Sequence, residues 1–555
     1  MSTTSTDQGL NFASLIESVA DSQPEALALA QGDRRLSWAG FDERGSRFAA
    51  GLRSIGLAEG SKVAMYLHNG NEYLEAILGA FKARATPANV NYRYVEEELA
   101  YLLEDADAEA ILFTGALAER VDRVRHLVPT LKASIQVDDG HPLLAGAVAY
   151  EELLASVAPL SRTERSGDDL CLLYTGGTTG RPKGVMWRQR DGFAAVAPMA
   201  YRFSGATPPE RNEEAGERAG VVRGQGMTPV ALPAPPLMHG TAFMTSVQAL
   251  LLGGAVVTLE GRSLDSHELW RAVERERVTQ VTIVGDAFAR PMVRALDEAV
   301  ERGRPYDLSS LRLVVSSGAM WSASVKADLA RHKPMMLVDS LSASEGVGFA
   351  ISLTPPGIEP ETARFVRGER TKVFTEDGRE VEPGSGEVGL LAVGGPIPLG
   401  YHKDPVKTAA TFRTFGGNRY SVPGDFARVD ADGTIFLLGR GSGCINTAGE
   451  KVFPEEVEEV LKEHPAVADC AVVGVPDERW GEAVTAVVAL EEGSSASEEE
   501  LIASTKGRLA GFKSPKRVVF VDAVPRGAAG KVDYSGAREA AHLPPGRPGR
   551  CSPSV

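Results

Sequence analysis

Short apolar runs alternate with helical patterns through most of residues 1–440, and this alternation constrains the fold more than any other feature. The run Lys62–Leu67 predicts a strand, and residues 72–83 predict a helix that follows it. Similar apolar runs occur at residues 110–113, 255–258, 281–284 and 311–315. Repeated strand, turn and helix is typical of an α/β fold, in which ligands bind at the carboxyl ends of the strands.

The pattern changes near residue 425. Two short apolar runs, 425–429 and 434–438, flank a turn sequence and predict a β-hairpin. The glycine-rich stretch 439–443 follows and suits a hinge. The remaining patterns predict a small α+β domain, with helices at 454–463 and 497–509 and strands at 469–473 and 483–490. We therefore expect an N-terminal domain over residues 1–440 and a C-terminal domain over residues 441–540.

Two stretches lack a periodic apolar pattern. Residues 204–226 are rich in Gly, Pro, Glu and Arg, and their composition predicts a mobile surface loop. Residues 541–555 contain several prolines and predict a disordered tail.

Composition excludes several classes of protein. The formal net charge is −15 and no long basic block is present, which argues against nucleic acid as the main partner. The four cysteines lack metal-ligand spacing, so a reduced, cytoplasmic protein is expected. The N-terminal residues show no secretory signal, and the longest apolar stretches are too short to span a bilayer.

The sequence YTGGTTGRPKG at residues 174–184 has the chemistry of a phosphate-binding loop. Its glycines allow backbone N–H groups to converge on an anion, its threonines add hydroxyl donors, and Lys183 adds a positive charge. The loop is not a Walker A motif, because Arg181 and Pro182 separate Gly180 from the lysine and no hydroxyl residue follows. The residues alone leave a Gly- and Thr-rich surface turn as the alternative.

This loop closely resembles the signature sequence of the adenylate-forming superfamily, which includes acyl-CoA synthetases, luciferases and adenylation domains of peptide synthetases. The resemblance implies a large multi-sheet α/β N-terminal domain and a small mobile α+β C-terminal domain. It also implies that the loop holds the β- and γ-phosphates of ATP. The implied contacts are Thr175, Gly176, Gly177, Thr178, Thr179, Gly180 and Lys183.

Further motifs of the superfamily follow in the same order along the chain. PLMHG resembles the histidine motif and places His239 where the acyl and pantetheine channels meet, although a lone histidine is more often structural. Residues 316–320 resemble a loop beside adenine, and residues 339–345 resemble a segment near the α-phosphate and Mg²⁺. The implied nucleotide contacts are Ser317, Gly318, Ala319, Met320, Asp339, Ser340, Leu341 and Ser344. The implied Mg²⁺ ligands are Glu345 and Thr175.

Two positions depart from the superfamily pattern. Leu341 stands where an aromatic residue commonly stacks on adenine, and Ser442 stands at a hinge position that is usually Asp or Lys. The flanking motifs agree: Asp425 and Arg440 take the positions of ribose contacts. The pantetheine of coenzyme A (CoA) is expected along Gly449, Glu450 and Lys451.

PRGAAGK at residues 525–531 resembles the motif that supplies the catalytic lysine, here Lys531. The resemblance implies that the substrate carboxylate attacks the α-phosphorus of ATP, and that the CoA thiol then displaces AMP. The first step needs charge neutralisation rather than a general base, because a carboxylic acid is already ionised at pH 7. Glu345, Lys531 and His239 are the implied catalytic residues, with the small domain rotating between the two steps.

The acid is expected to be hydrophobic, either a fatty acid or a steroid side-chain acid. The string VMWRQ after the loop resembles a subset of actinobacterial acyl-CoA synthetases, and Met199, Phe203, Phe243 and Met244 are candidates for an apolar pocket. Transfer to a carrier protein, luciferase-like oxidation and a non-catalytic binding relative stay open as alternatives. The resemblance is compatible with a homodimer, which the sequence itself does not indicate.

Overall fold

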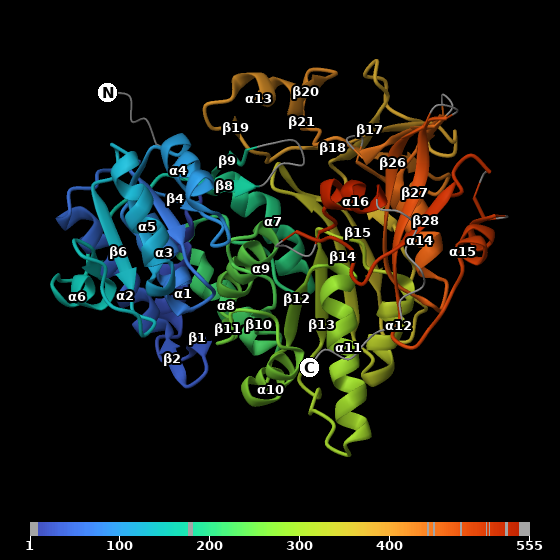
Figure 1. Cartoon of the computed structure of the whole chain (residues 1–555). Coiled ribbons are helices and arrows are strands. Elements are labelled where there is room, and N and C mark those ends of the chain that lie inside the picture. Colours follow the sequence, from blue (N-terminus) through green and yellow to red (C-terminus); the bar gives the residue numbers. More distant parts are fainter. Residues whose placement is uncertain are drawn as a thin grey trace.

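The structure is a computed structural model that describes residues 9–175, 181–440, 443–447, 450–477, 480–506, 508–509, 511–527 and 531–542. Three β-sheets organise this part of the chain (Figure 1). The order of strands in the largest sheet is β2 (Arg34–Ser37), β1 (Leu27–Gln31), β11 (Ala255–Thr258), β10 (Val230–Pro233), β12 (Gln280–Ile283), β13 (Leu313–Ser317), β14 (Met336–Ala343), β15 (Gly346–Thr354), β16 (Arg364–Arg367), β23 (Ile435–Arg440), β22 (Asp425–Val429), β18 (Val388–Gly394), β21 (Asn418–Ser421) and β20 (Phe412–Phe415), with β17 (Thr371–Phe374) also beside β18. Strands β1 and β10 to β14 are parallel, and the pairs from β14–β15 onward are antiparallel.

The second sheet carries the predicted phosphate loop. Its order is β19 (Gly400–Tyr401), β9 (Lys183–Arg188), β8 (Leu170–Thr175), β4 (Thr86–Asn89), β3 (Lys62–Tyr66), β5 (Ala108–Thr114), β6 (Ala133–Val137) and β7 (Val148–Ala149). Strands β8 and β9 form an antiparallel hairpin, while β3 to β8 are otherwise parallel. The hairpin therefore stands at the edge of a parallel sheet.

Helices fill the space between these two sheets and cover their outer faces, which gives five layers. One continuous apolar core joins both sheets to α1 (Phe12–Ser22), α2 (Trp38–Ser54), α3 (Asn71–Lys82), α7 (Gln189–Phe203) and α9 (Gly240–Leu251). The outer face of the largest sheet is covered by α10 (Ser266–Glu276), α11 (Gly285–Glu301) and α12 (Ala323–His332), and that of the second by α4 (Glu96–Asp105) and α5 (Ala118–Val124). Every residue of α3 is buried, because packed elements surround this helix.

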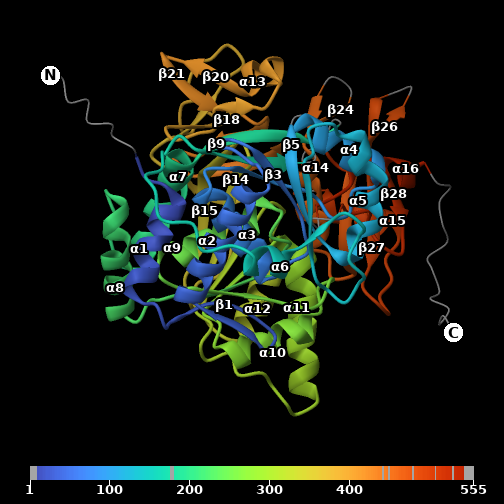
Figure 2. The same ribbon diagram turned by 90° about the vertical axis from the view of Figure 1, so that its left-hand side faces the viewer.

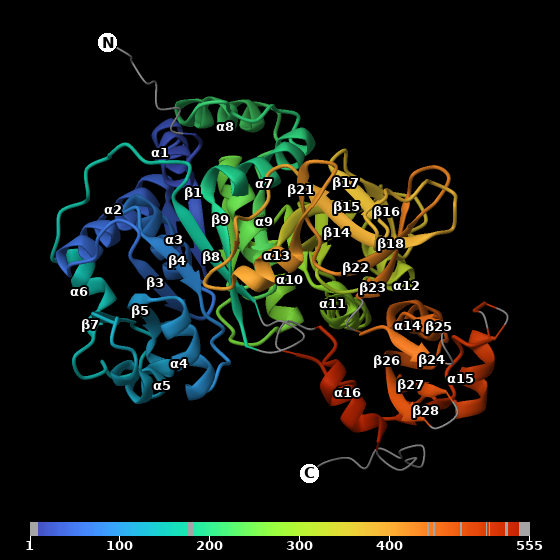
Figure 3. The same cartoon turned by 90° about the horizontal axis from the view of Figure 1, so that it is seen from above.

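The third, smaller sheet lies in the C-terminal part of the chain and is set to one side of the larger sheets (Figure 3). It contains β25 (Glu450–Val452), β24 (Ile445–Thr447), β27 (Gly481–Leu490), β26 (Val467–Asp477) and β28 (Arg517–Phe520). Alternate residues of β26 and β27 face opposite sides, as the period of a strand requires. One side packs on α14 (Pro454–Lys462) and α15 (Glu498–Thr505), and the other on α16 (Tyr534–Ala541). The predicted fold class, a multi-sheet α/β part followed by a small α+β part, is confirmed.

The expected mobile loop at 204–226 is wrong in its second half. Residues Ala215–Gly224 form helix α8, which lies beside α1 (Figure 2). Ala215, Ala219 and Val222 are buried at helical spacing, and a Cβ at Gly216 would stand 2.4 Å from the carbonyl oxygen of Ser18. The polar composition of this segment obscured the helical spacing of its few buried apolar residues.

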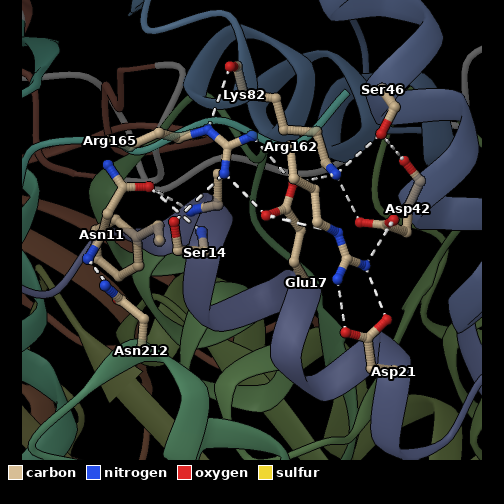
Figure 4. Close-up of polar contacts among 12 residues, drawn as sticks. Asn11, Ser14, Glu17, Asp21, Asp42, Ser46, Lys82, Arg162, Arg165 and Asn212 are labelled. Atoms are coloured by element: carbon tan, nitrogen blue, oxygen red, sulfur yellow. Dashed lines mark hydrogen bonds and ion pairs between the residues drawn. The ribbon is translucent and has the colours of Figure 1, made fainter. Parts of the chain in front are cut away.

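A group of charged side chains, buried at its centre, surrounds the segment that leads into β8, and we call it the hairpin network. It comprises Glu17, Asp21, Asp42, Lys82, Arg162 and Arg165 (Figure 4). Lys82 Nζ lies 2.7 Å from Glu17 Oε1 and 2.6 Å from Asp42 Oδ1, and its side chain is 1% exposed. Arg165 adds hydrogen bonds of 2.8 and 3.0 Å to the carboxylate of Glu17. These contacts join α1, α2 and α3 to the segment that leads into β8.

Candidate functional site

The inner end of the β8–β9 hairpin carries the predicted phosphate loop. Thr175 ends β8 and is the register partner of Lys183, which begins β9. Lys183 Nζ forms an ion pair with Asp404, the residue that caps α13 (Pro405–Thr411). The predicted contacts Gly176, Gly177, Thr178, Thr179 and Gly180 lie outside the described residues. The structure therefore positions Thr175 before the loop and Lys183 after it, opposite each other in the hairpin.

Asn89, at the end of β4, ties this hairpin to the histidine segment, and sequence reasoning missed it. Its Nδ2 donates to the carbonyl oxygens of Tyr174 at 2.9 Å and Met238 at 2.6 Å. The backbone N–H of Tyr174 donates to Asn89 Oδ1 at 2.6 Å. An amide side chain at the carboxyl end of a buried parallel strand was the available signal.

His239 immediately precedes α9 and lies close to the charge of Lys531. Burial, followed by the charges of Lys531 and Arg93, lowers the pKa of His239 to about 4. Its Nε2 is buried, and no hydrogen-bond partner for it occurs within the part of the chain that the structure describes. At neutral pH this position therefore holds an uncharged imidazole, whose free ring nitrogen suits a ligand contact rather than a purely structural role.

Lys531, from the small C-terminal part, reaches the loop at the end of β13. A Cβ placed on Gly318 would lie 3.3 Å from Lys531 Cε and 3.8 Å from its Nζ. Gly318 has φ +99°, a backbone conformation that favours glycine, and Ser317 before it pairs with Ser340 of β14. The structure therefore brings together Lys531, His239 and residues 317–318, although they are far apart in sequence.

The rest of the predicted adenine loop turns away from β13 against α11. The Met320 carbonyl oxygen accepts a hydrogen bond of 3.0 Å from the backbone N–H of Asp286, and Ala319 packs against the core on that side of the sheet. A Cβ at Gly285 would stand 2.2 Å from the same Met320 oxygen, so the close approach requires glycine there.

Asp339 lies on β14, where its side chain is buried beside Lys326 of α12. Lys326 Nζ is 3.4 Å from Asp339 Oδ2 and 3.0 Å from the carbonyl oxygen of Glu361. Burial raises the pKa of Asp339 to about 6, an effect that Lys326 opposes and Asp286 reinforces. Leu341, two residues further, is partly buried and packs against the central apolar core.

Glu345 follows β14, and a tyrosine holds its carboxylate. The hydroxyl of Tyr401 donates to Glu345 Oε1 at 2.7 Å. The indole N–H of Trp187 donates to the carbonyl oxygen of Ser344 at 2.9 Å. Because Tyr401 lies in β19, which pairs with β9, both contacts attach the predicted metal ligand to the phosphate-loop hairpin.

Asp425 and Arg440, the two predicted ribose contacts, are direct cross-strand partners at the ends of β22 and β23. The side chain of Arg440, the hinge residue Ser442 and Gly449 lie outside what the structure describes. Glu450 and Lys451 belong to β25, where only their backbone is described. The domain boundary and the CoA contacts therefore stay predictions.

The candidate apolar-pocket residues do not share one environment. Phe243 is buried in the central core and Met244 packs against that core. Phe203, the last residue of α7, is 41% exposed. Among the described helices, none is both long and apolar enough to cross a bilayer. Within the same residues, no three His, Cys, Asp or Glu side chains gather as a metal cluster.

Comparison with known families and proteins matches nearly the whole chain. The AMP-binding enzyme family matches residues 16–402, and its C-terminal domain matches residues 456–531. The chain is 43% identical over 551 residues to a 3-oxocholest-4-en-26-oate–CoA ligase of Rhodococcus rhodochrous, covering 97% of each. It is 43% identical over 556 residues to a medium-chain acyl-CoA ligase of Mycobacterium avium, covering 97% of this chain and 99% of the relative.

The fold is similar to that of an anthranilate CoA ligase solved in complex with anthranoyl-AMP. The TM-score is 0.82 at 21% sequence identity, and the similarity covers 98% of this chain and 99% of the other.

Proposed function

Since the chain belongs to the AMP-binding enzyme family, we propose that it is an AMP-forming acid–CoA ligase acting on a hydrophobic carboxylic acid. In the first half-reaction, the substrate carboxylate attacks the α-phosphorus of ATP, which gives an acyl-adenylate and pyrophosphate. In the second, the CoA thiol attacks the acyl carbonyl, which gives the thioester, AMP and a proton. The observation that carries this proposal is the approach of Lys531 to Gly318 beside His239.

Lys531 has one chemical task in this scheme. Negative charge moves along the phosphates as pyrophosphate leaves, and a positioned ammonium group stabilises it. His239 is neutral, so its imidazole adds no positive charge that would compete with Lys531 for the phosphates. The residues 425 and 440, paired across β22 and β23, suit the two hydroxyls of a ribose.

The surroundings of Glu345 also suit a magnesium ion bound together with ATP. Mg²⁺ commonly takes one or two carboxylates together with substrate phosphates and water, and Glu345 is a carboxylate that Tyr401 orients from β19, the strand that pairs with β9 of the hairpin. When bound, this ion would neutralise phosphate charge.

The acid is a medium- or long-chain fatty acid or a steroid side-chain acid. Relatives that are 39–43% identical over nearly the full chain carry these substrates in their names, which supports the assignment. A cytoplasmic location and a homodimer stay predictions, which fractionation and light scattering would check.

The test is to supply ATP, Mg²⁺ and a panel of fatty acids and 3-oxocholest-4-en-26-oate, with and without CoA. Pyrophosphate and acyl-CoA should both form. Lys531→Ala should slow pyrophosphate release about a hundredfold and spare thioester formation from supplied acyl-adenylate. Pyrophosphate without thioester would favour transfer to a carrier protein, light emission would favour a luciferase, and neither product from any acid would overturn the proposal.

A further inference from the structure

A second group of charged side chains lies in the small C-terminal part, next to the segment that carries Lys531. We call it the lysine-loop network, and it comprises Glu458, Lys462, Asp469 and Arg526. Both Nε and Nη2 of Arg526 donate to the carboxylate of Asp469 at 2.7 Å. Lys462 Nζ lies 3.3 Å from Asp469 Oδ1. The side chains of Arg526, Asp469 and Lys462 are 19%, 23% and 3% exposed, so solvent screens these contacts weakly.

The backbone couples Arg526 directly to the catalytic lysine candidate. The N–H of Gly527 donates to the carbonyl oxygen of Lys531 at 2.8 Å, and Arg526 forms an antiparallel bridge with Val532. The N–H of Asp533 donates to the carbonyl oxygen of Pro525 at 3.0 Å. Residues 525–527 and residues 531–533 are therefore joined by backbone hydrogen bonds. Because of these bonds, a contact that fixes the position of Arg526 also restricts the position of Lys531.

The far end of the loop is held by the same network. Tyr534 Oη lies 3.4 Å from Glu458 Oε1, and the backbone N–H of Val472 donates to that oxygen at 2.8 Å. Glu458 and Lys462 lie on α14, and Asp469 lies on β26. Contacts on both sides of Lys531 thus lead back to one helix and one strand.

The contact between Arg526 and Asp469 is chemically suited to fixing the orientation of the Arg526 guanidinium. Burial would raise the pKa of Asp469, but the hydrogen bond from Arg526 and the charges of Lys462 and Arg526 lower it, so this carboxylate is ionised at neutral pH. Two parallel N–H···O bonds fix the plane of a guanidinium in a way that one ammonium contact does not. Catalysis by a charged group is sensitive to displacements of about 1 Å.

We propose that Arg526 and Asp469, supported by Lys462, are positioning residues that hold Lys531 against the Gly318 loop during adenylate formation. This inference rests on the proposed function.

The experiment measures both half-reactions in the full-length enzyme with Arg526→Gln, in the natural background and in the Lys531→Ala background. We expect Arg526→Gln alone to slow pyrophosphate release by at least tenfold and to change thioester formation from supplied acyl-adenylate less than twofold. Since Arg526 acts through Lys531, the same substitution should cause no further loss when Lys531 is already Ala. Arg526→Lys, which keeps the charge without the paired bonds, should restore part of the rate.

Lys513→Gln is the matched control, because Lys513 forms a mostly buried ion pair with Glu456 of α14 at 2.6 Å and, among the described residues, makes no hydrogen bond or ion pair with residues 525–527 or 531–534. It should leave both half-reactions unchanged. An additional loss from Arg526→Gln in the Lys531→Ala background, or equal losses in both half-reactions, would overturn the positioning role. If Arg526→Gln fails to fold, Asp469→Asn and Arg526→Lys take its place with the same expected pattern. Failure of Lys531→Ala itself to slow pyrophosphate release would instead overturn the proposed function.

Discussion

The hairpin network and the lysine-loop network are two clusters of charged side chains with buried centres. The hairpin network joins three helices to the segment before β8, at the end of the hairpin opposite the phosphate loop (Figure 4). The lysine-loop network instead contacts the chain on both sides of Lys531, at Arg526 and at Tyr534. The first is placed to stabilise the large domain, and the second to orient one side chain.

The carboxyl groups of the two networks differ in their electrostatics. Burial would raise the pKa of Glu17, yet Arg165 and Lys82 outweigh it and the pKa is lowered. Burial also raises the pKa of Glu458. The charge of Lys462 and the hydrogen bond from the Val472 backbone lower this pKa, but by less than burial raises it. A buried carboxylate with two close cations stabilises a fold, whereas one with weaker compensation costs stability as the pH rises.

The largest expected effect breaks the hairpin network at its centre. Lys82→Met should lower the free energy of unfolding by about 3–5 kcal/mol, because it leaves the Glu17 and Asp42 carboxylates without their shared buried cation. Chemical denaturation measures the loss. Both half-reactions should keep their rates at a temperature where the variant is folded, and a selective loss of pyrophosphate release would contradict the purely stabilising role.

The next test applies the same substitution to both networks. The folded pKa of Glu17 is lowered, so its contribution to stability is present above the ordinary glutamate pKa of 4.5 and is lost as pH falls through the folded pKa. The folded pKa of Glu458 is raised, so its contribution is present below the ordinary pKa and is lost as pH rises through the folded pKa.

Glu17→Gln should therefore destabilise the protein by about 3 kcal/mol at pH 8 and by less at pH 3, whereas Glu458→Gln should be neutral or stabilising at pH 8. Denaturation curves at the two pH values measure both. Losses of the same size and pH dependence from the two variants would remove the distinction between the networks.

A smaller effect is expected at the nucleotide end of the hairpin, on rate rather than on stability. Tyr401→Phe removes the donor to Glu345 Oε1 and should lower pyrophosphate release about tenfold at limiting Mg²⁺, with partial recovery at high Mg²⁺. The control is Tyr201→Phe, which removes a buried hydroxyl that donates to the Leu251 carbonyl oxygen at 3.0 Å. If Tyr401→Phe has the same Mg²⁺ dependence as the natural enzyme, Tyr401 does not orient the predicted metal ligand Glu345.

The smallest effect concerns Asp339. Because its pKa is raised to about 6, the charged form that accepts hydrogen bonds best increases as the pH rises through that value. We therefore compare the KM for ATP of the natural enzyme with that of Asp339→Asn. The ratio of the natural KM to the variant KM should fall about threefold to fivefold between pH 5 and pH 8. The ratio is the useful quantity, since phosphate groups also titrate in this range. Parallel profiles would argue against contact between Asp339 and the nucleotide.

Local patterns predicted much of the fold. The periodicity of Leu74, Ile77 and Leu78 gave α3, and the apolar runs around residues 430–433 gave the β22–β23 hairpin. Helix α8 was missed, because its four buried positions include a glycine and sit among Gly, Arg and Glu, and its stability comes from packing on α1. The site motifs were equally local, so His239, Glu345 and Lys531 were found while Asn89 was not.

By itself, the sequence determined the order of strands and helices, the family and the residue types at each motif, because these depend on spacing within a few residues. The tertiary structure alone decided which partners meet: Tyr401 with Glu345, Arg526 with Asp469, and Lys531 with Gly318. Such pairs join segments far apart in the chain, and the packing of whole sheets, rather than any local pattern, sets the distance between them.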